Sequence, residues 1–187
     1  MQRPSKEPEQ NFRDSRDVGA ARRHWRNYLE RNQSIMVQLF CGQTRSVLRC
    51  QACRGESVTY REFTNLTLPL PETMGRVNLR DCFEELLREE RIDEFTCEQC
   101  KRAGPHSKKI DIVKLPPLLV LHLSRFYQDG NYTRKKQNSV HFDLAGVNMG
   151  KFALDNFDNK FSNFNLYAVS NHFGSLEGGH YTAYCNR

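Results

Sequence analysis

The clearest pattern of apolar and polar positions in the chain lies between residues 79 and 87. Its apolar side chains recur every three or four positions, which places them on one face of a helix. They are Leu79, Cys82, Phe83, Leu86 and Leu87. Asn78 precedes them as a candidate N-cap, and Asp81 falls in the first turn, where a carboxylate is favoured. The pattern predicts an amphipathic helix here.

A second, short amphipathic helix is predicted near the start of the chain. Good helix formers between residues 20 and 31 surround three large apolar side chains that share one helical face, namely Trp25, Tyr28 and Leu29. Residues 1–19 contain two prolines, many charges and few apolar side chains, so they cannot bury enough surface to offset the entropy cost of ordering. We therefore predict a disordered tail or linker over 1–19 and a folded unit over 20–187.

Most of the remaining chain has the composition of β-strands. Segments rich in β-branched and aromatic residues occur at 44–50, 57–70, 107–126, 165–173 and 179–185. Pro116 and Pro117 divide the third segment into two strands. A glycine-rich stretch between the last two segments predicts a hairpin. The fold class expected is α+β, with a predominantly antiparallel sheet and at least two helices.

Composition narrows the class of protein. Apolar residues make up 38% of the 187 residues and twelve are phenylalanine, which excludes a wholly disordered chain. The longest apolar run, near Leu118, is far shorter than the roughly 20 residues that span a bilayer, and the N-terminus has no apolar signal region. The seven cysteines, without a secretory signal, favour metal ligation and reduced thiols over disulfides. We expect a reducing, cytosolic or nuclear compartment and no membrane span.

Four of the cysteines form two C-x-x-C pairs, Cys50 with Cys53 and Cys97 with Cys100. Two such knuckles are the arrangement that holds tetrahedral Zn²⁺ in structural ribbons, and four protein thiolates leave no position for a catalytic water. The 43 residues from 54 to 96 exceed the usual ribbon spacing, so a helix and strands must be inserted between the knuckles. The alternative is a set of four thiols without metal.

The other cysteines and two histidines are candidates for catalysis. Cys82 falls on the apolar face of the predicted helix and Cys185 on a predicted strand, and both are expected to be buried thiols. Cys41 is a weak nucleophile candidate because no helix begins beside it. His180 follows two glycines at the mouth of a predicted strand, where a side chain can face a cleft. His172 is the second candidate. Either histidine, taken alone, is also compatible with a purely structural role.

Several of these segments together resemble the catalytic domain of ubiquitin-specific proteases. The resemblance is carried by SIMVQLFCGQTRSVLRCQAC, LTLPLP, LPPLLVLHLSRF and NLYAVSNHFGSLEGGHYTAYC, in this order, and covers about residues 25–187. It implies a papain-like architecture of fingers, palm and thumb, with the zinc ribbon in fingers that grip ubiquitin. In the family's Gly-Gly-His-Tyr motif the histidine is the general base, a role that carries over to His180. Residues expected to contact the substrate are Gly178, Gly179, His172 and Tyr181.

The chain departs from the family's pattern in two ways. The family's nucleophile lies in a Gly-Asn-Thr-Cys box, and its third triad member, an aspartate or asparagine, follows the histidine after a strand and turn. Neither the box nor this downstream segment occurs in the 187 residues. We therefore expect a partial domain with fingers and palm but without the thumb. We expect it to be inactive by itself, because a thiol mechanism requires a nucleophile, a base and a third group that fixes the tautomer of the catalytic histidine.

The resemblance implies ubiquitin and ubiquitinated proteins as partners and a cytoplasmic location, with the nucleus also open. Within the family, the sequence most resembles that of the endosome-associated members. The first alternative function is a non-catalytic ubiquitin-binding module. The second is a nucleic-acid-binding zinc ribbon, which the net charge of +6 favours. Eight acidic residues between 78 and 98 argue against nucleic acid, because they lie next to the predicted ribbon.

Overall fold

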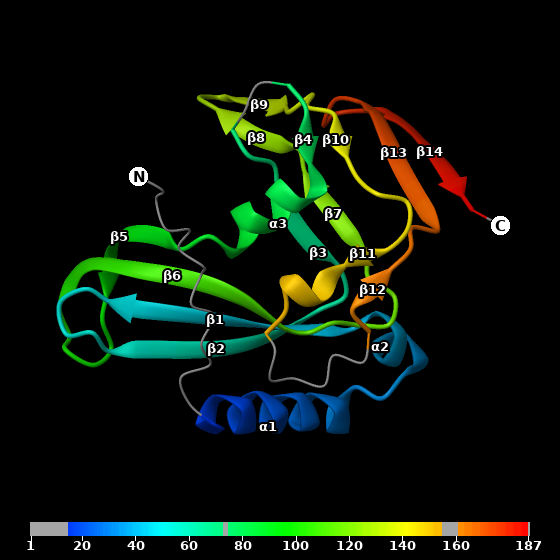
Figure 1. Cartoon of the computed structure of the whole chain (residues 1–187). Coiled ribbons are helices and arrows are strands. Elements are labelled where there is room, and N and C mark those ends of the chain that lie inside the picture. Colours follow the sequence, from blue (N-terminus) through cyan, green and yellow to red (C-terminus); the bar gives the residue numbers. More distant parts are fainter. Residues whose placement is uncertain (1–14, 73–74, 155–160, 187) are drawn as a thin grey trace, which may run out of the picture.

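The computed structural model describes residues 15–72, 75–154 and 161–186 (Figure 1). Most of the predicted tail, residues 1–14, lies outside the described residues. The rest of that segment differs from the prediction, because helix α1 (Ser15–Arg31) begins at Ser15 and includes residues 15–19. Asp17 lies in its first turn, where the helix dipole favours a carboxylate.

A four-stranded antiparallel sheet forms the longest part of the molecule. Its strand order is β2-β1-β6-β5. The strands are β1 (Gly42–Cys50), β2 (Glu56–Phe63), β5 (Glu90–Thr96) and β6 (Ala103–Lys114). The order places two hairpins, β1–β2 and β5–β6, side by side, joined by the antiparallel pairing of β1 with β6. Both hairpin turns therefore lie at the same end of the sheet, on the left in Figure 1.

Helix α1, which includes the amphipathic helix predicted over residues 20–31, runs along the four-stranded sheet (Figure 1). Ala21 is fully buried in a small cluster with Val113 and Leu154, and Tyr60 packs against them. The Tyr60 hydroxyl donates a hydrogen bond to the carbonyl oxygen of Asp17 at 3.1 Å. These contacts attach the helix to strands β2 and β6.

The main hydrophobic core lies beyond the sheet, around helix α3 (Leu79–Leu87). This helix has the bounds that the sequence predicts, with Asn78 and Asp81 forming a capping box. Its buried Cys82 and Phe83 meet leucines of strand β3 (Leu66–Pro69), which pairs with β7 (Leu121–Ser124). The β3–β7 pair is parallel, although the sequence predicts a mainly antiparallel sheet. The long excursion between the two strands, which includes α3 and β6, allows the chain to return in the same direction.

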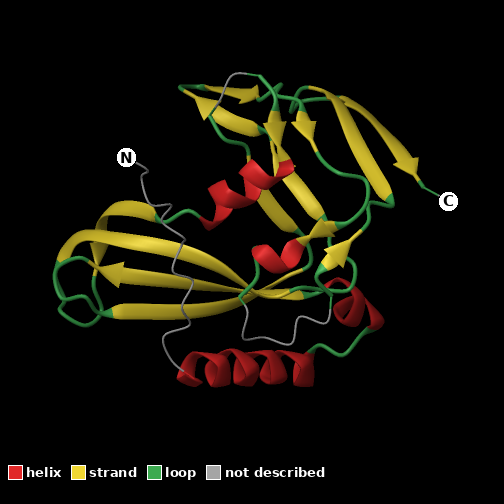
Figure 2. Cartoon of the chain, in the orientation of Figure 1, coloured by secondary structure: helices red, strands yellow, loops and turns green. Residues whose placement is uncertain are grey.

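Smaller elements surround this core (Figure 2). Two antiparallel hairpins, β8–β9 and β13–β14, lie at the top of the view in Figure 1. Their strands are β8 (Phe126–Asp129), β9 (Tyr132–Lys135), β13 (Ala168–Gly174) and β14 (Gly179–Cys185). The remaining elements are α2 (Ile35–Phe40), β4 (Val77–Asn78), β10 (Val140–His141), β11 (Val147–Asn148), η1 (Met149–Lys151) and β12 (Asn163–Phe164). The α+β fold class, with its antiparallel sheet, agrees with the prediction.

None of the helices within the described ranges has the length and apolar character that crossing a bilayer would require.

Candidate functional sites

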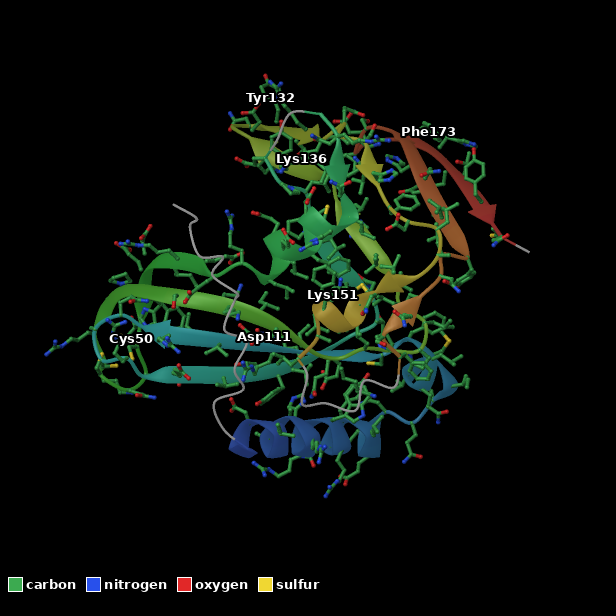
Figure 3. All side chains as sticks on the ribbon, viewed as in Figure 1. Cys50, Asp111, Tyr132, Lys136, Lys151 and Phe173 are labelled. Carbon is green, nitrogen blue, oxygen red and sulfur yellow. The ribbon has the colours of Figure 1, made fainter. Side chains whose placement is uncertain are left out.

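The four cysteines of the two knuckles come together at the tip of the four-stranded sheet (Figure 3, label Cys50). Cys50 ends strand β1, and Cys53 lies in the turn to β2. Cys97 and Cys100 lie in the turn between β5 and β6. The pairing of Cys50 with His106 of β6 holds the two turns next to each other. The sheet topology thus closes the gap of 44 positions between Cys53 and Cys97.

The sulfur atoms have the spacing that a single metal ion requires. All four lie within 4.8 Å of one another. The Sγ atoms of Cys53 and Cys97 are 3.6 Å apart, and those of Cys50 and Cys100 are 4.0 Å apart. Four sulfurs at about 2.3 Å from a tetrahedral Zn²⁺ would lie about 3.8 Å from one another. The four thiols therefore lie close enough together to ligate one metal ion.

The two knuckles have the same backbone shape. Among the described residues, only Arg54 and Lys101 combine a side chain with a positive φ, at 61° and 59°. Each directly follows the second cysteine of its knuckle. The Arg54 amide donates to the carbonyl oxygen of Cys50 at 3.0 Å, and the Lys101 amide donates to that of Cys97 at 2.9 Å. Repetition of this uncommon conformation shows that the two knuckles contain matching tight turns.

The electrostatic surroundings of two of these thiols differ. The backbone N–H of Cys100, followed by that of Gln99, donates to the Cys97 sulfur and lowers the pKa of this thiol to about 6. The Gly55 N–H acts in the same direction on Cys53, but desolvation and the three neighbouring thiols raise the pKa of Cys53 to about 11. Cys97 therefore offers a ready thiolate, the form in which cysteine ligates metals.

The other cysteines lie elsewhere, and one differs from its prediction. Cys41 and Cys82 are buried, and burial raises the pKa of each thiol. The Cys41 sulfur lies 3.7 Å from the Tyr28 hydroxyl. Cys185, predicted to be buried, is exposed. Within the described part of the chain, strand β14 belongs to a two-stranded sheet with β13, which leaves the Cys185 sulfur open to solvent.

These environments predict the order in which the three thiols react. Iodoacetamide at neutral pH should modify Cys185 at least about tenfold faster than Cys41 or Cys82, because Cys185 is exposed, whereas burial shields the other two thiols and raises their pKa. Mass spectrometry of tryptic peptides after short exposures would give each rate. Equally fast labelling of Cys41 would contradict its burial and restore it as a candidate nucleophile, whereas unfolding in urea should make all three rates similar.

His180 lies on the exposed hairpin β13–β14. It occupies the second position of β14 and pairs with Phe173 of β13. Gly178 and Gly179 precede it, and the Ser175 amide donates to the Gly178 carbonyl oxygen at 3.0 Å to close the turn. The imidazole is solvent-exposed, in a position from which it can reach a molecule bound outside the hairpin.

His172 and Tyr181 lie on the opposite face of the same hairpin. They form a cross-strand pair, and their ring centroids are 4.7 Å apart. The space beside Gly179 is filled by His172, since a Cβ built there would lie 2.3 Å from the imidazole Nε2. Only glycine fits at this position. His172 is half-buried, and its Nδ1 lies 3.1 Å from Lys135 Nζ, a contact to which sequence analysis gave no clue because 37 positions separate the two.

Comparison with known proteins places the chain in a family. Residues 4–187 match the family model described as ubiquitin carboxyl-terminal hydrolase. The chain belongs to the ubiquitin carboxyl-terminal hydrolase family. It is 40% identical to ubiquitin carboxyl-terminal hydrolase 21 of Rattus norvegicus over 167 residues, covering 86% of this chain and 29% of the relative. It is also 40% identical to ubiquitin carboxyl-terminal hydrolase 2 of Gallus gallus over 173 residues, covering 90% of this chain and 48% of the relative.

Solved structures show the same fold. The SAGA Ubp8/Sgf11/Sus1/Sgf73 DUB module bound to ubiquitin aldehyde matches 91% of this chain and 40% of its own chain, with a TM-score of 0.69 and 22% identity. The chain thus spans less than half the length of these hydrolase relatives. The family assignment agrees with the resemblance seen in the sequence. The likeness to endosome-associated members stays a prediction.

Proposed function

We propose that this hydrolase-family chain binds ubiquitin and provides the general base for thiol-dependent hydrolysis of the bond after ubiquitin's C-terminal glycine. The observation that carries the proposal is the exposed His180 behind two glycines, on a hairpin of a chain that belongs to the ubiquitin carboxyl-terminal hydrolase family. A base in this position takes a proton from an attacking thiol and returns it to the leaving amine.

The described thiols do not pair with His180 as a nucleophile would. Cys41 is 2% exposed and directly precedes strand β1, which belongs to a different sheet from β14. Cys185 is exposed, but it is five positions beyond His180, and alternation along the strand places it on the other face. The family's Gly-Asn-Thr-Cys box is absent from the sequence given. We therefore propose that these 187 residues bind ubiquitin without cleaving it.

We further propose that Cys50, Cys53, Cys97 and Cys100 hold one structural Zn²⁺. The sulfur spacing and the matched knuckles support this choice of ion, because four thiolates in a tetrahedron favour zinc. The metal would tie the two hairpins together at the tip of the four-stranded sheet. A reducing, cytoplasmic or nuclear location is proposed with it, since the thiols must stay reduced to bind metal.

Several basic side chains along the four-stranded sheet are paired with carboxylates, which favours a protein partner over nucleic acid. Lys108 pairs with Glu90 at 3.8 Å, and Lys109 lies 3.5 Å from Asp111. Arg49 pairs with Glu56 on the neighbouring strand. Basic side chains that are already paired with carboxylates offer little net positive charge to phosphates. The surface is therefore a poor match for the basic stripe of a nucleic-acid-binding ribbon.

The proposal predicts binding of ubiquitin without turnover. Fluorescence anisotropy of labelled ubiquitin should show saturable 1:1 binding to the zinc-loaded chain, and ubiquitin lacking its two C-terminal glycines should bind more weakly. A fluorogenic C-terminal amide of ubiquitin should not be hydrolysed above the rate of buffer, because an imidazole without a thiol leaves only water as the attacking group.

Three outcomes separate the possible functions. Absence of saturable binding would contradict the proposed function. Turnover that Cys41→Ala abolishes would show that Cys41 is the nucleophile and that its burial is relieved in the complex. Binding of single-stranded nucleic acid that weakens steeply with salt, in place of ubiquitin binding, would establish the ribbon function instead.

A further inference from the structure

Lys135, the last residue of strand β9, directs its ammonium group at the neighbouring hairpin. Nζ donates to His172 Nδ1 at 3.1 Å and to the carbonyl oxygens of His172 and Gly174 at 2.9 and 3.1 Å. An ammonium has three donors, so all three are used on strand β13. The side chain is half-buried, and the same Nζ lies 5.8 Å from the ring centroid of Phe126.

The ammonium fixes the tautomer of His172. Lysine's ammonium can only donate, so Nδ1 must accept, and the ring proton lies on Nε2. That ring then fills the space over Gly179, directly before His180, where Nε2 would lie 2.3 Å from any added Cβ. Tyr181 and Phe126 flank the imidazole at centroid distances of 4.7 and 6.1 Å.

The same contacts fix the start of the turn before His180. Gly174, whose carbonyl accepts from Lys135, pairs with Gly179 and has a φ of 121°, a conformation that few residues other than glycine adopt. Lys135 thus contacts strand β13 directly through its hydrogen bonds to the two carbonyl oxygens. It contacts strand β14 indirectly, because the His172 ring that it holds packs against Gly179. In Figure 3 the hairpin that carries Tyr132 and the strand that carries Phe173 lie together at the top of the molecule. The face that bears His180 stays open to solvent.

We propose that Lys135 is a positioning residue of the ubiquitin-tail site: by clamping strand β13 and the His172 imidazole against Gly179, it sets the place of His180 on the opposite face. The proposal rests on the proposed function for its role in ubiquitin binding. The clamp itself is a property of the two hairpins and can be tested separately.

The first test measures the clamp without ubiquitin. In Lys135→Met the aliphatic stem remains and the ammonium is lost. Two-dimensional ¹H–¹⁵N spectra of histidine-labelled, zinc-loaded chain should show His172 with its proton on Nε2 in the wild type and a mixture of tautomers in the variant. Amide exchange should rise at least about tenfold at Ser175, whose N–H closes the turn. Lys151→Met, which replaces an exposed lysine of η1, should change neither signal.

The second test measures the consequence for binding. Lys135→Met should weaken ubiquitin binding about tenfold, the size expected for losing one charge-assisted interaction, while Lys151→Met binds like wild type. If wild type binds ubiquitin and Lys135→Met binds equally well, the positioning role is wrong. If wild type does not bind ubiquitin, the proposed function and this role fail together, and an unchanged His172 tautomer in Lys135→Met would overturn the clamp as well.

Discussion

Replacing Cys97 with serine is expected to abolish binding of the proposed Zn²⁺ and to loosen the tip of the four-stranded sheet. Cys97 is 5% exposed and has the lowered pKa that provides a ready thiolate. A serine hydroxyl is a much poorer ligand for zinc, and three thiolates leave the site open. Structural zinc sites in small domains contribute apparent binding energies of about 10–16 kcal/mol that are coupled to folding. The variant should therefore lose several kcal/mol of stability at the tip.

Elemental analysis and thermal unfolding would measure this effect. The wild type should contain about one zinc per chain, and Cys97→Ser close to none, with a broader transition at lower temperature. Cys185→Ser is the matched control, because Cys185 is an exposed cysteine outside the cluster, and it should keep both the metal and the transition. A Cys97→Ser variant that retains a full equivalent of zinc would show that this thiol is not a ligand.

Replacing Arg45 with methionine is expected to destabilise the protein by about 3 kcal/mol, the cost of breaking a mostly buried ion pair. Arg45 lies on strand β1 and bridges two carboxylates, Asp111 on β6 at 2.7 Å and Asp17 on helix α1 at 2.8 Å. The Asp111 side chain is only 6% exposed, so losing the guanidinium leaves a buried carboxylate with Lys109 as its neighbour. The same change removes one of the two contacts described for Asp17 in the first turn of α1 and leaves only the Tyr60 hydrogen bond to its carbonyl oxygen.

The single tryptophan makes the release of α1 measurable. Trp25 lies on this helix, with Lys114 Nζ 5.5 Å from its ring, so its fluorescence reports whether α1 is docked on the sheet. When the Arg45→Met variant is titrated with urea, the fluorescence of Trp25 should change at a lower urea concentration than the circular dichroism signal of the sheet.

A matched substitution on the same strand separates this effect from a general loss of charge. Arg49→Met removes an exposed pair with Glu56 and should cost less than about 1 kcal/mol. The role given to Arg45 would be contradicted if the fluorescence and circular dichroism transitions of Arg45→Met coincided and both variants had the same free energy of unfolding.

The local structure of this protein could be predicted from its sequence because periodicity and turn chemistry are local properties. The 3.6-residue pattern at 79–87 gave the helix with its observed bounds, and the glycines at 178 and 179 marked the last hairpin. The spacing of the cysteines identified the four thiols that the structure brings together. The motifs, in their order, also indicated the family that the comparison established.

Features that depend on contacts between distant segments required the tertiary structure. Alternation places Cys185 on one face of its strand, but only the packing shows that none of the described elements covers its sulfur. The parallel pairing of β3 with β7 depends on how the chain returns after a long excursion. Nothing in the local sequence distinguishes Arg45 and Lys135 from other charged residues, because their partners Asp111 and His172 lie 66 and 37 positions away. A sequence pattern specifies which face a side chain occupies, whereas the partner that meets that face depends on the arrangement of all the elements.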